Sequence, residues 1–144
     1  ILCLIYASYG GIACGFTVSG RLFFDQPLEM DTRAIAALAI VMQCGIDFDS
    51  AAKTITDGYH DIGIDAVYND AVQKKLILVQ SKWRKDGNGS VSQEEVNTFI
   101  SGIKRVINLD FDGCNKKLVA KQPEITAAIR DMDYQIEMVF CHKR

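Results

Sequence analysis

The chain has 144 residues, of which 49% are apolar and 24% charged, and its formal net charge is −2. This length suits one domain with its own core, and the composition is ordinary for a globular protein, which excludes a low-complexity chain. The five cysteines are scattered without a C-x-x-C pair, and only His60 and His142 are present. The sequence therefore predicts a cytoplasmic protein with reduced thiols and argues against a zinc site.

The charges are unevenly distributed along the chain. Residues 74–121 carry a net +5, and the rest of the chain carries −7. Such asymmetry can place a basic face beside an acidic site, although a solvated helix face is an equally good interpretation of the basic run. The net charge alone does not indicate a nucleic-acid binder.

Residues 1–20 are uncharged, and no basic residue precedes Arg21. Their length alone would permit a membrane span, a secretory signal or a membrane-tethered assembly module. Four glycines and several polar residues interrupt the segment. We expect instead a buried helix or strand pair packed on a domain formed by residues 21–144. Because the chain begins with Ile, we also expect a fragment of a longer protein.

A helix is predicted from Leu28 to about Gly45, with Pro27 compatible with its first turn. Glu29 and Asp31 lie where acidic side chains suit the helix dipole. The run Phe48-Asp49-Ser50-Ala51-Ala52 then predicts a short helical turn over 48–52. Its expected N-cap is Asp49 or Ser50.

Two strands are predicted next, over 62–68 and 75–83, because both runs are rich in β-branched and aliphatic residues. If they form a hairpin centred between residues 72 and 73, Asp65 lies opposite Gln80.

Gln80 and Lys82 point to the same face of the second strand, since alternate residues share a face. A carboxylate from Asp65, an amide oxygen and an ammonium would then converge at the end of an apolar sheet. Burying such groups costs free energy unless they satisfy one another or bind something. The trio is therefore a candidate functional site, and a purely structural polar network is the alternative.

Residues 84–90 are predicted to form a loop, and the capping-box pattern over 92–95 opens a helix. Its expected apolar positions are Val96, Phe99, Ile100, Ile103 and Ile107. A second helical region is interrupted by Pro123 and runs to about Met132, and a strand follows over 134–140. The order predicts a three-layer α/β domain whose mixed central sheet is flanked by helices.

Three motifs carry a resemblance to a known family. They are I-T-D-G at 55–58, D-I-G-I-D-A-V-Y at 61–68 and L-V-Q-S-K-W at 78–83. Together they resemble the PD-(D/E)xK nuclease superfamily in its Q-x-K variant. The closest likeness is to the N-terminal domain of abortive-infection phage-resistance (AIPR) proteins, and Mrr-type restriction endonucleases are similar. The likeness is densest over 56–83, looser over 25–140 and does not extend to 1–20.

The resemblance implies a restriction-endonuclease-like fold and metal-dependent hydrolysis of DNA phosphodiester bonds, in phage defence or restriction. Asp65 and Gln80 would bind Mg²⁺, for which Mn²⁺ could substitute, because oxygen ligands suit hard cations. Lys82 would orient the attacking water and stabilise charge on the phosphate. The family often adds an acidic residue from the first helix, which we expect to be Glu29, with Asp31 as the alternative.

Asp57, Asp61 and His60 lie in the loop before the first strand. Asp commonly shapes turns, so we expect Asp61 to support the loop rather than bind the ion, and His60 to be exposed or to contact substrate. The expected phosphate contacts are Arg84, Lys85, Lys104, Arg105, Lys116 and Lys117.

The expected partner is double-stranded DNA, with a homodimer suggested by the need to cut two strands. The alternative function is a catalytically inactive nuclease-like domain that binds nucleic acid, because Gln80 brings no charge to the metal.

Overall fold

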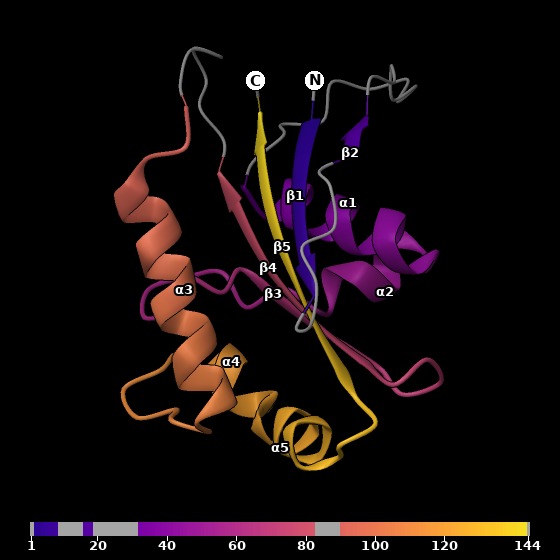
Figure 1. Ribbon diagram of the computed structural model, residues 1–144, viewed down its shortest axis with the longest axis vertical. Helices are drawn as coiled ribbons and strands as arrows, with labels where there is room; N and C mark the ends of the chain where they lie inside the picture. The colour runs from indigo at the N-terminus through magenta and orange to yellow at the C-terminus, as the bar shows by residue number, and fades with distance from the viewer. Residues whose placement is uncertain (1, 9–15, 19–31, 83–89, 144) are drawn as a thin grey trace.

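The computed structural model describes residues 2–8, 16–18, 32–82 and 90–143, and the side chains of 32–82 and 90–142. Figure 1 shows the elements in chain order. They are β1 (Leu2–Ser8), β2 (Phe16–Val18), α1 (Thr32–Cys44), α2 (Phe48–Ala52), β3 (Ala66–Asp70), β4 (Lys75–Lys82), α3 (Gln93–Ile107), α4 (Lys116–Ala120), α5 (Gln122–Arg130) and β5 (Gln135–Lys143).

The strands form one sheet of order β2-β1-β5-β4-β3. Its β3, β4 and β5 make a mixed arrangement, because β3 pairs with β4 antiparallel and β4 pairs with β5 parallel. The predicted mixed α/β domain is thus confirmed, as is the order of helix, two strands, helices and strand. The parallel pair is connected through α3, α4 and α5, as parallel strands require a long crossover.

The apolar segment at the start of the chain contributes two strands to this sheet. β1 pairs antiparallel with β5 from Leu2 opposite Lys143 to Ser8 opposite Glu137, and β2 pairs with β1. Of the two structures expected for residues 1–20, the part that is described therefore matches the strand pair. Among the residues described, none of the helices is both long and apolar enough to span a bilayer.

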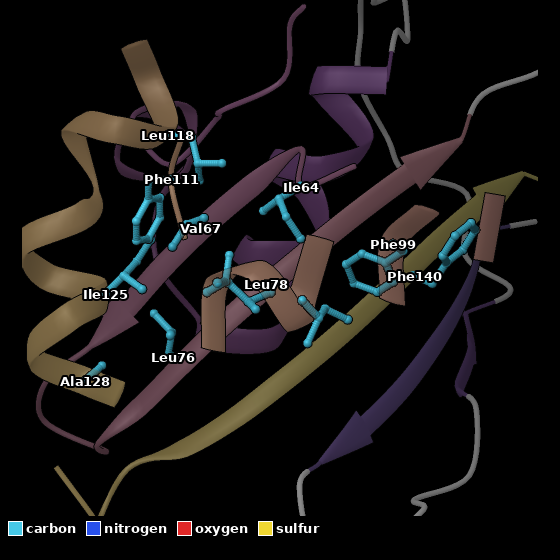
Figure 2. Packing of buried hydrophobic residues seen from close by; sticks show 12 residues of the cluster. Ile64, Val67, Leu76, Leu78, Phe99, Phe111, Leu118, Ile125, Ala128 and Phe140 are labelled. Atoms are coloured by element: carbon cyan, nitrogen blue, oxygen red, sulfur yellow. The ribbon is translucent and has the colours of Figure 1, made fainter. Parts of the chain in front are cut away.

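Helices cover both faces of the sheet (Figure 1). Alternation along β4 sends Ile77 and Val79 into a core with α1, and Leu76 and Leu78 into a second core with α3 and α5. Figure 2 shows this second core, which also contains Phe111, Leu118 and Ile125. The six central residues of β4 are buried, as expected for a strand between two helical layers.

The helix α3 is held against the second core by part of its predicted apolar face. Phe99 and Ile103 are buried, and the ring of Phe99 meets Phe140 of β5 edge-on at 5.8 Å between centroids. Val96 and Ile100, which share the predicted helical spacing, are 37% and 43% exposed. The helix meets the sheet through a narrower stripe, in which the small residue Gly102 takes the place of a larger apolar side chain.

The ends of several helices follow local rules. Ser92 and Glu95 form the predicted capping box at the start of α3. The predicted N-cap of α2 was wrong: the cap is Asp47, whose carboxylate accepts the N–H of Ser50 at 2.8 Å. The described part of α1 begins at Thr32, and its first turn holds no acidic residue.

The first strand of the hairpin is shorter than predicted. β3 begins at Ala66, whereas the sequence predicted a strand from Ile62. Ile62 has a φ of +54°, a left-handed conformation that no strand residue adopts. Residues 62–65 therefore belong to the loop that leads into the sheet.

Candidate metal and catalytic site

The hairpin register brings Asp65 beside Gln80. The ladder pairs Ala66 with Val79 and Asp70 with Lys75, which is the predicted register centred between residues 72 and 73. Asp65 directly precedes this ladder, and its N–H donates to the carbonyl of Val79 at 2.8 Å. The predicted proximity of the two polar residues at this end of the sheet is confirmed.

The carboxylate of Asp65 is buried and anchored to β4. Asp65 is 3% exposed. Its Oδ2 accepts hydrogen bonds from the backbone N–H of Ser81 at 2.7 Å and from the Ser81 hydroxyl at 3.1 Å. The same hydroxyl donates to the carbonyl of Thr32 at 2.7 Å, where α1 begins. Ser81, which sequence reasoning did not single out, therefore ties the acid to both β4 and α1.

The surroundings of Asp65 favour its neutral form. Burial raises the pKa of this carboxyl to about 6, and the negative charges of Asp61 and Asp57 contribute to the rise. The N–H of Ser81 and the ammonium of Lys82 lower the pKa, but their effect is smaller. A bound cation would offset the repulsion between this buried carboxylate and the other acids, and would thereby stabilise its ionised form.

The loop before β3 holds two further acids in a fixed backbone. Asp61 accepts the N–H of Gly58 at 3.1 Å through Oδ2 and the N–H of Gly63 at 2.8 Å through Oδ1. His60 and Ile62 have φ of +63° and +54°, which is costly for residues with a Cβ and especially for a β-branched one. The surrounding contacts must therefore hold this loop.

Those contacts come from the other elements of the domain. Asn115 donates its N–H to the carbonyl of His60 at 3.0 Å and its side-chain amide to the carbonyl of Thr56 at 2.9 Å. Helix α3 also contacts this loop. It approaches so closely that a Cβ on Gly102 would lie 2.2 Å from the carbonyl oxygen of Ile62. The loop is thus clamped between α3 and the start of α4.

Asp57, Asp61 and Asp65 lie together at this site, each offering one carboxylate oxygen within 4.8 Å of the others. Two ligands on opposite sides of a Mg²⁺ ion are about 4.2 Å apart, so these oxygens are close enough to share one cation after small side-chain movements. The sequence did not predict this grouping for Asp57 and Asp61, which were interpreted as turn residues. The even spacing of three aspartates over nine residues was the available signal.

Asp57 is in contact with two cationic side chains. Its Oδ2 accepts the Nε of Arg33 at 2.7 Å, and its carbonyl accepts the ammonium of Lys117 at 2.9 Å. The exposed guanidinium of Arg33 would have to share Asp57 with any bound cation.

Gln80 supplies the observation that points most directly to a ligand. It is 1% exposed, yet its side-chain oxygen has no hydrogen-bond partner among the described residues. A buried amide oxygen without a partner is costly, and a bound water or a hard cation would satisfy it. The donors available here, carboxylates and an amide carbonyl, fit Mg²⁺ or Mn²⁺ and not a thiophilic metal.

The remaining predicted site residues divide into those described and those not. Lys82 is partly buried at the end of β4, and its charge reaches Asp65. Glu29, Asp31, Arg84 and Lys85 lie outside the described residues. Lys104 is exposed on α3, whereas the guanidinium of Arg105 is bound to Asp110 at 2.9 Å, which limits its use for phosphate contacts.

Comparison of this chain with protein-family models, with curated proteins and with solved structures finds no significant match.

Proposed function

We propose that this chain is a restriction-endonuclease-like nuclease domain of the Q-x-K type, which hydrolyses phosphodiester bonds of DNA with the help of Mg²⁺ or Mn²⁺. The observation that carries the proposal is the pairing of Asp65 with Gln80 at one end of the sheet. Extending the hairpin register places Asp65, whose burial raises the pKa of its carboxyl to about 6, opposite Gln80, whose buried amide oxygen has no hydrogen-bond partner among the described residues. The family resemblance of the three sequence motifs supports the same reaction.

The residues that would hold the ion are Asp65 and Gln80, with Asp61 and Asp57 within reach of the same position. When bound, such an ion would supply Lewis-acid stabilisation of the phosphate and lower the pKa of a water. Glu29 stays a proposed further ligand on the basis of the resemblance alone.

Lys82 is the residue that we assign to the reaction itself. It lies two residues after Gln80 on the same face of β4, and its ammonium is close enough to lower the pKa of Asp65. There it would orient the attacking water and stabilise the negative charge that builds on the phosphate oxygens. Its removal should lower kcat more than it weakens DNA binding.

Plasmid nicking in Mg²⁺ or Mn²⁺ tests the proposal, with the native protein compared with Asp65→Ala and Lys82→Ala. Lys53→Ala is the matched control, because Lys53 is exposed at the end of α2 and its loss changes the charge equally. We expect metal-dependent nicking by the native protein and the control, and a loss of at least about a hundredfold in both site variants. Equal nicking by all four proteins would refute the assignment.

A second candidate function is a nuclease-like domain that binds DNA without cutting it. The neutral side chain of Gln80, at a position where the superfamily more often has Asp or Glu, favours this alternative. DNA binding that persists in EDTA, without product in any divalent ion, would identify it.

A further inference from the structure

The turn at residues 58–61 carries two aromatic residues, Tyr59 and His60, between Asp57 and Asp61. The N–H of Asp61 donates to the carbonyl of Gly58 at 3.2 Å, which places Tyr59 and His60 at the two central positions. The residues that flank these rings in sequence, Asp57 and Asp61, both belong to the acidic cluster. The turn that carries these rings therefore belongs to the same loop as two of the three aspartates.

The side chain of Tyr59 is highly exposed to solvent, although its backbone is held in a hydrogen-bonded turn. It is 86% exposed, and its ring meets the ring of His60 edge-on, with 4.0 Å between centroids. Single exposed apolar residues are common on surfaces and usually need no explanation. Val72 and Met132 are also highly exposed, but they lie at the other end of β4 from Asp65.

The backbone under Tyr59 is held in place rather than free to adapt. Both carboxylate oxygens of Asp61 bind N–H groups of the turn, and Asn115 binds the carbonyl of His60. The positive φ of His60 is maintained by these contacts. An aromatic side chain on such a support loses little entropy when a flat ligand stacks on it, which is the condition for a stacking platform.

Positive charges around the turn favour an anionic polymer. Lys117 donates to the carbonyl of Asp57, Arg33 pairs with the Asp57 carboxylate, and Lys116 is exposed in the next helix. Backbone phosphates could contact these cations while a base lies on the ring.

We propose that Tyr59 stacks on one unpaired nucleobase next to the phosphate that is cleaved. The substrate class would then be single-stranded DNA, or DNA that exposes an unpaired nucleotide at this position. A paired base offers its faces only to its neighbours in the helix, so an intact duplex would gain little from the ring. This inference rests on the proposed nuclease function and specifies its substrate.

The test is fluorescence anisotropy with a labelled single-stranded dodecanucleotide and with the duplex of the same sequence, both in Ca²⁺. Tyr59→Ala should bind the single strand about 5- to 150-fold more weakly, the loss that removal of one stacked base produces. Tyr59→Phe should retain the affinity, because the ring and not the hydroxyl makes the contact. Val72→Ala, an equally exposed change in the β3–β4 turn, is the matched control and should bind like the native protein.

The outcomes separate this inference from the function on which it rests. If Tyr59→Ala binds the single strand like the native protein while Lys82→Ala abolishes nicking, the stacking role is wrong and the nuclease stands. If Tyr59→Ala changes the sedimentation of the protein but not its DNA affinity, the ring is a protein contact and the inference fails. If no form binds or cuts nucleic acid, both proposals fall.

Discussion

The carboxylate of Asp65 accepts the backbone N–H of Ser81 at 2.7 Å, and so joins the residue before β3 to the end of β4. This bond fixes the acid to the strand that carries Gln80 and Lys82 on either side of Ser81. This strong donor also offsets part of the cost of burying Asp65, a residue that is 3% exposed.

The first prediction concerns the pH dependence of stability in EDTA. The pKa of Asp65 is raised from its ordinary value of 3.8 to about 6 in the folded protein, so its contribution is fully present below about pH 3.8 and is lost as the pH rises through 6. Asp65→Asn removes this titration. Relative to the native protein, the variant should gain about 2 to 3 kcal/mol of unfolding free energy between pH 4 and pH 7.5. Urea denaturation at both pH values measures the difference, and a constant offset between the proteins would contradict the burial argument.

The second prediction concerns divalent ions. The proposed cation, with Asp65, Asp61 and Gln80 as its expected ligands, would bind only the folded state, so Mn²⁺ at a hundred times its Kd should stabilise the protein by about 2.7 kcal/mol. Thermal unfolding at pH 7.5 should show a higher Tm with Mn²⁺ for the native protein, and no such increase for Asp65→Asn.

Asp133→Asn is the control for the metal experiment, because Asp133 is an exposed acid that pairs only with Lys74 among the described contacts. It should respond to Mn²⁺ like the native protein. An equal rise in Tm for Asp65→Asn would show that the ion binds elsewhere.

The third prediction concerns the contact between α3 and the loop. In Gly102→Ala the new methyl group would lie 2.2 Å from the carbonyl oxygen of Ile62, so helix or loop must move. We expect a loss of about 1 to 3 kcal/mol in unfolding free energy, together with weaker Mn²⁺ binding, because the displaced loop carries Asp61. Ser101→Ala, the neighbouring exposed helix position, should change neither quantity. Urea denaturation and a Mn²⁺ titration provide the two readouts.

The fourth prediction concerns a buried ion pair at the opposite end of the sheet. The ammonium of Lys75 lies 2.8 Å from the carboxylate of Glu137, which is 1% exposed. Lys75→Ala removes this ammonium from the buried carboxylate and should cost about 2 kcal/mol, less than the loss from a fully buried pair because Lys75 is partly exposed.

The adjacent Lys74→Ala serves as the comparison for that variant. Its ion pairs with Asp131 and Asp133 lie at the surface and should contribute less than about 1 kcal/mol. Chemical denaturation of both variants measures the difference, and similar losses would argue against a special role for the buried carboxylate.

The parts of the fold that the sequence predicted are those set by local pattern. Two runs rich in β-branched and aliphatic residues, with a polar turn between them, were sufficient to predict the hairpin, and its observed register places Asp65 opposite Gln80 as expected. The capping box of α3 was equally readable, because its two side chains and the backbone they bind lie within one turn.

The parts that the sequence did not predict depend on contacts between distant segments. Ile62 has the composition of a strand residue, yet it is held in a left-handed conformation by the approach of Gly102 and the turn bonds of Asp61. That turn is what brings Asp57 and Asp61 to Asp65. No local propensity indicates it, because tertiary packing overrides the preference of Ile for β structure.

The parallel pairing of β4 with β5 has a consequence for the order of folding. The β3–β4 hairpin is local and closes a short loop, whereas β4 meets β5 only after α3, α4 and α5 have been traversed. Because long loops close slowly and at greater entropic cost, we expect Asp65 and Gln80 to meet early, in a hairpin that is still open to water. The burial that raises the pKa of Asp65 would then be acquired last, when the second neighbour of β4 docks.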